Sequence, residues 1–140
     1  MRQILLFAAL AASLALLSGC TLSKTKADTA EDMPDKAAYH KISAEEAYEM
    51  MASQEVVVVD VRTREEYDGG HIENAVLVPN ESIDSEMPEV LPDKEATLLV
   101  YCRSGRRSKD AAQKLLALGY QSVYDFGGVI DWPYELVKEG

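Results

Sequence analysis

The sequence contains few residues of the types that bind metals or form disulfides. Its 140 residues include two cysteines, Cys20 and Cys102, together with two histidines and one tryptophan. The histidines and cysteines are far apart, so no segment has the ligand spacing of a metal site, and we expect no metal. No glycine-rich phosphate loop follows the first predicted strand, so we expect neither a nucleotide nor any other cofactor.

Basic residues are also scarce. Lys and Arg total 14 against 24 Asp and Glu, and the formal net charge is −10. A strongly acidic domain is poorly suited to binding nucleic acid, because it would repel the phosphate backbone. We therefore expect no nucleic-acid partner, and we expect the domain to be a monomer.

The N-terminus has the outline of a secretory signal. Arg2 precedes an uncharged apolar run over 4–17, which is too short to span a bilayer comfortably. The run leads into Leu17-Ser18-Gly19-Cys20, which resembles the lipobox of bacterial lipoproteins. An ordinary cleaved signal and a short uncleaved anchor are the alternatives.

The lipobox resemblance implies a membrane anchor. Residues 1–19 would be cleaved, and Cys20 would carry a diacylglyceryl group and a further acyl chain such as palmitate. The protein would then lie in the bacterial cell envelope, on the periplasmic or extracytoplasmic face of a membrane. Thr21 after the cysteine, in place of Asp, favours the outer membrane where there is one.

We predict a flexible tether over 20–37 and a single folded domain over 38–140. The tether is rich in Lys, Thr, Ala and Asp and has no apolar periodicity. If Cys20 is lipidated, Cys102 is the one remaining thiol and no internal disulfide can form. A lone cysteine is often simply buried, so its neighbours decide whether it is reactive.

The folded part begins near Tyr39 and alternates predicted helices with short, β-branched strands. Ser43 and Glu46 have the spacing of a capping box at the first helix. This order is typical of an α/β domain with a mostly parallel sheet and helices on both faces. The predicted helices are 44–52, 62–68, 82–90, 108–118 and 132–137, and the predicted strands are 56–59, 75–78, 97–101 and 121–124.

In such sheets, functional sites form at the carboxyl ends of the strands. Asp60, Pro79 and Cys102 each stand at a predicted strand end. Cys102 then begins a short loop before a helix, whose N-terminus favours negative charge. Three arginines in the loop and the permissive backbone of its glycine also favour a thiolate. The loop residues, which we expect to bind an anionic substrate, are Arg103, Ser104, Gly105, Arg106 and Arg107.

From about residue 38 to 137, the chain resembles the rhodanese-like single-domain sulfurtransferases. Each matching piece is weak alone, but their order along the chain is that of the family. The pieces are Ile42-Ser43, 58–62 with Glu65-Glu66-Tyr67, Gly70-His71-Ile72 with Ala75, Pro79, the Cys102 loop, and Gly127-Gly128 with Trp132. The resemblance implies about five strands in the sheet.

The resemblance also implies an activity. Cys102 would take a sulfane sulfur from a donor such as thiosulfate or a persulfide, and would pass it to a thiol or cyanide-like acceptor. Arg103 and Arg106 would bind the anionic donor, and Arg107 would turn toward Asp60 or another acid. Asp60 and Arg62 would support the site, either directly or as a structural ion pair.

Three other functions stay open from the sequence. Related phosphatases and arsenate reductases place an arginine six residues after the cysteine, but here that residue is Ser108, and Arg107 comes five after it. A second alternative is a non-catalytic adaptor: many rhodanese-like domains lack the cysteine and serve as adaptors, and the presence of Cys102 argues against that role. A third is thiol redox work, since a lone thiol could form mixed disulfides. We interpret His71 as a structural turn residue, His40 as a surface residue and Trp132 as a core residue.

Overall fold

The structure is a computed structural model that describes residues 37–138. The predicted signal segment, Cys20 and residues 20–36 of the tether lie outside the described residues. The elements, in chain order, are β1 (Ala38–Lys41), α1 (Ala44–Ser53), β2 (Val57–Asp60), α2 (Arg64–Asp68), β3 (Val76–Leu77), η1 (Asn80–Ser82), β4 (Thr97–Cys102), α3 (Arg106–Ala117), β5 (Ser122–Gly128) and η2 (Val129–Asp131).

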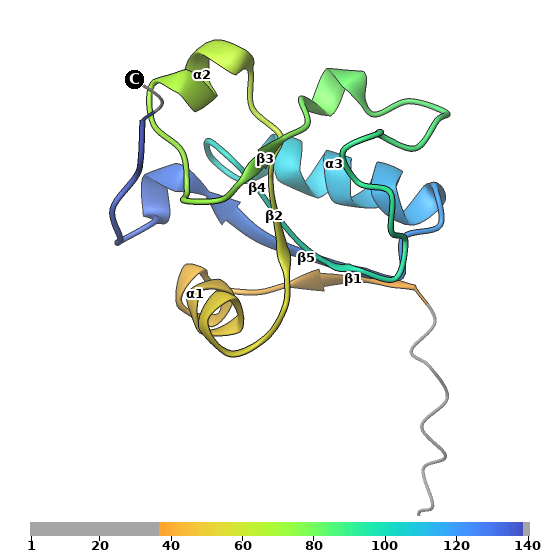
Figure 1. Cartoon of the computed structure of the whole chain (residues 1–140), viewed down its shortest axis with the longest axis horizontal. Helices are drawn as coiled ribbons and strands as arrows, with labels where there is room; N and C mark the ends of the chain where they lie inside the picture. The colour runs from red at the N-terminus through yellow and green to blue at the C-terminus, as the bar shows by residue number, and fades with distance from the viewer. Residues whose placement is uncertain (1–36, 139–140) are drawn as a thin grey trace, which may run out of the picture. The chain divides into compact units, whose positions relative to one another are not determined.

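The five strands form one parallel sheet in the order β1-β5-β4-β2-β3. Strand β4 lies at the centre, between β5 and β2, and α1 and α3 lie on opposite sides of the sheet (Figure 1). The predicted α/β fold with helices on both faces is therefore confirmed. Because all strands run the same way, their carboxyl ends lie along the same side of the sheet, and Cys102 lies there at the end of β4.

Each face of the sheet has its own apolar core, and alternate residues of β4 contribute to both. Leu98 and Val100 pack with α3 on one face, and Leu99 and Tyr101 pack with α1 and α2 on the other. These four side chains are fully buried. A strand covered on both faces explains why β4 reads as a continuous apolar run.

Two helices begin with a reciprocal capping box. At α1 the Ser43 hydroxyl accepts from the Glu46 amide, and the Glu46 carboxylate accepts from the Ser43 amide, as the spacing predicted. Thr63 and Glu66 make the same pair of bonds at α2. The short helix α2 is thus held at a defined position beside the end of β2.

Two predicted helices are wrong. Within 82–90 the structure has no helix beyond the single turn η1, because Pro88 removes a backbone donor and the Ser82 hydroxyl bonds back to the Pro79 carbonyl. Residues 132–137 are not helical either. Trp132 packs into the core at one end of the segment, and at the other end Val137 forms an antiparallel bridge with His71, so tertiary contacts hold the chain extended.

The bounds of several elements in the structure also differ from the predicted ones. Strand β1 was not predicted, since it has only four residues and none of them is fully buried. Helix α3 begins at Arg106, two residues before its predicted start, so its first turn is part of the arginine-rich loop. Strand β5 continues through the glycine pair to Gly128, beyond its predicted end at Tyr124.

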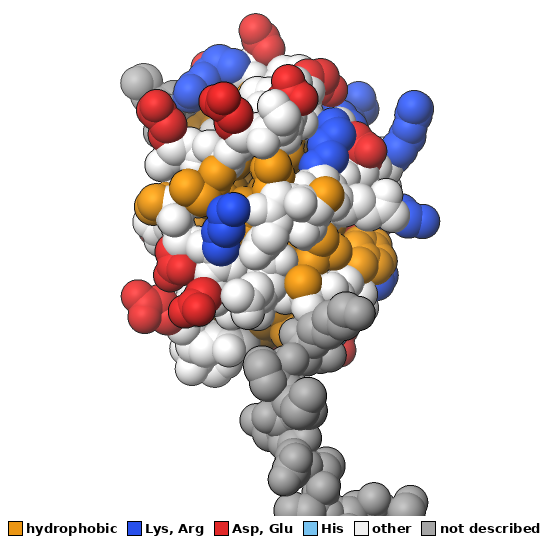
Figure 2. All heavy atoms as spheres, turned by 90° about the vertical axis from the view of Figure 1, so that its right-hand side faces the viewer, with side chains coloured by type: hydrophobic (Ala, Val, Ile, Leu, Met, Phe, Trp, Pro, Cys, Tyr) orange, Lys and Arg blue, Asp and Glu red, His pale blue; other side chains and the backbone are white. Residues whose placement is uncertain are grey.

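On the face shown in Figure 2, the basic side chains are scattered among acidic and apolar ones and form no continuous basic surface. Within residues 37–138, no helix has both the length and the apolar character needed to cross a bilayer.

Candidate active site

Cys102 is the last residue of the central strand, and its side chain is only 1% exposed. Residues 103–105 form a tight loop that leads into α3 at Arg106. Gly105 has a φ of 94°, in the left-handed region that glycine adopts without strain. This conformation turns the Gly105 amide back toward the strand, where it donates to Cys102 Sγ at 3.0 Å.

The environment of the thiol lowers its pKa. Burial by itself raises the pKa of Cys102, but hydrogen bonds from Ser108, Gly105 and Ser104 outweigh it. The Ser108 hydroxyl has one proton and lies 2.7 Å from the Asp125 carboxylate, so the backbone amides are the steady donors to sulfur. Amides converging at a helix N-terminus stabilise a negative charge. The site therefore favours a thiolate.

The end of β5 packs directly against the Cys102 loop. The strand carries one extra residue, Phe126, where its register with β4 shifts. Beyond this bulge, a Cβ on Gly128 would collide with the carbonyl oxygen of Arg103 and the Cα of Ser104. Only a glycine lets the two backbones approach this closely. The Gly127-Gly128 pair thus serves to position the loop.

A buried carboxylate under the loop was not predicted. Asp125 is 1% exposed and accepts from the Ser108 hydroxyl at 2.7 Å and from the Gly127 amide at 2.9 Å. It also accepts from the Tyr39 hydroxyl and lies 3.4 Å from the Lys41 ammonium. Burial and this carboxylate raise the pKa of Tyr39 to about 12. Asp125 therefore ties α3, β5 and β1 together beneath the site.

Arg107 does not point to Asp60. Its guanidinium donates to both carboxylate oxygens of Glu66 on α2, at 2.7 and 2.8 Å. These bonds, with a smaller contribution from Thr63, lower the pKa of Glu66 to about 2. The expectation that Arg107 binds an acid is met by a residue 41 positions away, which sequence spacing could not identify.

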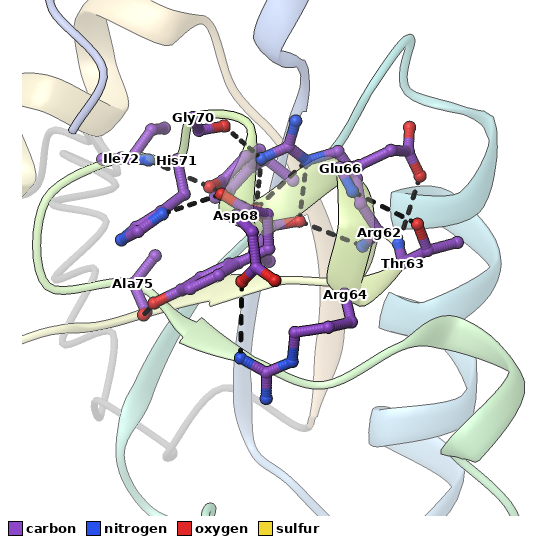
Figure 3. A network of polar contacts seen from close by, with 12 residues as sticks. Arg62, Thr63, Arg64, Glu66, Asp68, Gly70, His71, Ile72 and Ala75 are labelled. Atoms are coloured by element: carbon purple, nitrogen blue, oxygen red, sulfur yellow. Dashed lines mark hydrogen bonds and ion pairs between the residues drawn. The ribbon is translucent and has the colours of Figure 1, made fainter. Parts of the chain in front are cut away.

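Asp60 and Arg62 form a buried ion pair beside the site. Figure 3 shows Arg62 reaching toward Gly70 within this network of polar contacts. The Arg62 guanidinium donates to Asp60 at 2.6 Å and to the Gly70 carbonyl at 2.8 Å, and the Tyr101 hydroxyl donates to Asp60 at 2.6 Å. Burial and the neighbouring carboxylate raise the pKa of Tyr101. The hydrogen-bond partners of both side chains therefore lie within the protein. The pair holds the ends of β2 and β4 together, and it presents no unpaired charge to the Cys102 loop.

His71 and Trp132 occupy the structural positions expected of them, whereas His40, expected at the surface, is partly covered. The ring of His71 is buried, stacks on Tyr67 and places Nδ1 2.9 Å from the Tyr67 carbonyl. His40 is half-buried and stacks on Tyr124. Trp132 belongs to the core cluster on the α1 face. In the part of the chain that the structure describes, no group of three potential metal-binding side chains lies together.

Two surface hollows flank the loop. One, of about 620 Å³, is lined by Asn80, Glu81, Ser104, Arg106, Arg107 and Asp110. The other, of about 320 Å³, includes Arg103 with the apolar residues Val129, Ile130 and Leu136. Arg107 lines the first and Glu66 the second, so their ion pair forms the ridge between the hollows. Arg103, Ser104 and Arg106 are exposed, as a substrate-binding role requires.

The fold and the site together define a class: α/β proteins that hold a cysteine in a ring of amides between a parallel strand and a helix. The chain belongs to the rhodanese-like domain family, whose model matches residues 43–133. That match covers most of the described domain.

Individual relatives agree with this assignment. A tRNA uridine(34) hydroxylase of Yersinia pestis is 30% identical over 106 residues, which are 72% of this chain but only 30% of that protein. A rhodanese with anions from E. coli is 34% identical, with a TM-score of 0.54 over 59% of this chain and 98% of that one. A human single-domain sulfurtransferase is 26% identical, with a TM-score of 0.60 over 66% of this chain and 93% of that one.

Proposed function

We propose that the protein is a sulfurtransferase that carries a sulfane sulfur on Cys102. The observation that carries this proposal is the hydrogen bonding of Cys102 Sγ by the amides of its loop at the start of α3. The same amides can hold the terminal sulfur of a persulfide, which is also negatively charged. Sulfurtransferases among the structural neighbours support the same activity.

The reaction has two steps. The Cys102 thiolate attacks the outer sulfur of the donor. The bond between that sulfur and the rest of the donor breaks, and a Cys102 persulfide forms. With thiosulfate as donor, sulfite leaves with the electron pair of that bond. An acceptor such as cyanide or a thiolate then attacks the outer sulfur and restores the Cys102 thiolate. No external oxidant or reductant is needed, since the sulfur passes between nucleophiles.

The position of Arg107 weighs against a phosphatase or an arsenate reductase. A phosphate-binding loop needs an arginine that points into it, and in this structure Arg107 is bound by Glu66 outside the loop. Arg103 and Arg106 remain at the rim, where they can attract a small anionic donor. The near-complete burial of Cys102 also favours small sulfur compounds over mixed disulfides with large partners.

Sulfur loading of Cys102 tests the proposal. The protein is incubated with thiosulfate, or with a persulfide donor, and the peptide containing Cys102 is examined by mass spectrometry. We expect a gain of one sulfur atom on Cys102, release of thiocyanate when cyanide is added, and loss of both in Cys102→Ala. If no donor loads Cys102 and no thiocyanate forms, the activity is excluded. Turnover of an aryl phosphate would indicate a phosphatase instead.

We also propose that Cys20 anchors the protein in the bacterial cell envelope. The support is the Leu17-Ser18-Gly19-Cys20 sequence after a short apolar run. Expression of the full chain in a bacterium, followed by fractionation, tests it. The wild type should remain with the membranes, and Cys20→Ala should not be lipidated or retained there. Retention of Cys20→Ala in the membrane fraction would contradict an acyl anchor.

A further inference from the structure

The larger hollow beside the Cys102 loop carries charges of both signs. Arg106 and Glu81 both line it and both are exposed. Ser104 lines it as well, and the Ser104 backbone contributes to the hydrogen bonds on Cys102. The hollow therefore opens beside the site where the transferred sulfur would be held.

The other charged side chains that line the hollow, Arg107 and Asp110, are already paired with neighbouring side chains. Arg107 is paired with Glu66. Asp110 accepts from Asn80 at 2.9 Å and forms an ion pair with Lys114 at 3.1 Å, and these contacts, with a smaller contribution from Arg106, lower its pKa. Among the described residues, neither the Arg106 guanidinium nor the Glu81 carboxylate has a hydrogen bond or an ion pair. Arg106 interacts with Asp110, and Glu81 with Arg107, through longer-range electrostatics alone. One cation and one anion thus keep their hydrogen-bonding groups available for a ligand.

We propose that this hollow selects an acceptor thiol that carries both a carboxylate and an ammonium group, as an amino-acid thiol does. The proposal rests on sulfur transfer at Cys102. The carboxylate of the acceptor binds Arg106, and its ammonium group lies against Glu81. An anionic donor needs only the first of these contacts, so the presence of Glu81 distinguishes the acceptor from the donor.

The transfer balances without a further reactant. The acceptor thiol loses its proton to solvent, and its thiolate attacks the outer sulfur of the Cys102 persulfide. The bond between the two persulfide sulfurs breaks, and its electron pair stays on Cys102 as thiolate. The acceptor leaves as a persulfide, and total charge is unchanged.

The test uses the full chain with Cys102 loaded with sulfur from thiosulfate. Three acceptors are compared: cysteine, 3-mercaptopropionate, which lacks the ammonium group, and cysteamine, which lacks the carboxylate. The rate of loss of the Cys102 persulfide is expressed per thiolate present, because the three thiols differ in pKa. We expect cysteine to react about tenfold faster than either analogue, as loss of one charge-assisted contact implies.

Two variants assign the preference to residues. Glu81→Gln should remove the advantage of cysteine over 3-mercaptopropionate and leave the rate with 3-mercaptopropionate unchanged. Arg106→Gln should slow both carboxylate-bearing thiols and leave cysteamine unaffected. Glu86→Gln changes an exposed glutamate that lies beyond η1 and does not line the hollow; it is the matched control and should change nothing.

The outcomes separate the two proposals. If Cys102 is loaded but the three acceptors react equally per thiolate, or if Glu81→Gln slows all three alike, the selection of an amino-acid thiol is wrong and sulfur transfer stands. If Cys102 cannot be loaded at all, the proposed function itself fails.

Discussion

The sulfur of Cys102 accepts its hydrogen bonds from backbone amides that exist in this arrangement only in the folded protein. We therefore expect the pH midpoint for alkylation of Cys102 by iodoacetamide to lie below that of an ordinary thiol, about 8.5. Steric shielding of the sulfur should slow the reaction at every pH without moving the midpoint, because it limits access to the thiolate and does not change its population. Mass spectrometry of the Cys102 peptide, over a range of pH, measures it.

The same experiment in denaturant is the control. Unfolding removes the loop amides, so the midpoint should return to the ordinary value. A folded midpoint at or above that value would mean that burial outweighs the hydrogen bonds, and Cys102 would then be a protonated thiol at neutral pH.

Glu66 links the acid stability of the domain to its contact with Arg107. Its pKa is lowered from 4.5 to about 2, so its contribution to the free energy of unfolding is complete above pH 4.5 and is lost as the pH falls toward 2. Because the pair is partly exposed, we expect this contribution to be about 1–2 kcal/mol. Urea unfolding at several acid pH values measures the slope.

Glu66→Gln should flatten that slope, and Glu73→Gln, at an exposed glutamate, should preserve it. An unchanged slope in Glu66→Gln would show that the ion pair does not stabilise the fold.

At this scale, the sequence reveals residues that lie together along the chain and hides those that do not. Cys102 and its three arginines share one loop and were therefore identified as a group. The partner of Arg107 on α2 and the carboxylate of Asp125 come from distant segments, so no local pattern connects them to the loop. Asp125 did carry one signal, since it is an acidic residue that directly follows a predicted strand and comes two residues before a glycine pair.

The glycine pair at the end of β5 sets the position of the Cys102 loop. In Gly128→Ala the new Cβ would collide with the backbone of Arg103 and Ser104, so the loop must move. We expect the free energy of unfolding to fall by about 1–3 kcal/mol. Persulfide formation on Cys102 should slow by about tenfold or more, since small misplacements of reacting groups are costly.

Gly69→Ala is the matched control for this variant. Gly69 has a φ of −68°, and a Cβ there would come no closer than 3.4 Å to its neighbours. It should leave the rate of sulfur loading unchanged. A Gly128→Ala protein that loads Cys102 at the normal rate would show that the close approach of β5 does not position the site.

The elements were predicted from the sequence to the extent that each has a local cause. The helix α1 has its capping box and the strands β2 and β4 have β-branched or apolar runs, so these were found. Strand β1 has none of these features, because it is formed by pairing with β5 at the sheet edge. The irregular segment after η1 is held by tertiary contacts, such as the Leu91 carbonyl that accepts from the Tyr120 hydroxyl.

At the scale of the whole molecule, the two cores share one central strand. Leu98 packs in the α3 cluster, and Leu99 packs in the cluster that contains Trp132. Leu98→Ala and Leu99→Ala should each lower the free energy of unfolding by about 2–5 kcal/mol. Because β4 couples the faces, Trp132 fluorescence and far-ultraviolet circular dichroism should report the same shifted midpoint in both variants.

In Leu98→Ala, a circular dichroism midpoint that falls while the Trp132 fluorescence midpoint stays at the wild-type value would contradict this coupling. The α1 face would then unfold independently of the α3 face.

The fold class itself was predictable, because alternating helices and buried strands allow few arrangements other than a parallel sheet covered on both sides. The order of strands within the sheet depended on pairings between distant segments and was not predictable.

The contact between β5 and the Cys102 loop has a consequence for the timing of catalysis. With the Gly128 backbone against the loop and Asp125 holding Ser108 from below, the conformational entropy of the loop is lost once, when the chain folds. Each sulfur compound then meets a ring of amides that needs no rearrangement. Turnover would be limited by diffusion of small molecules and by exchange of sulfur bonds, with no step in which the protein must reorganise.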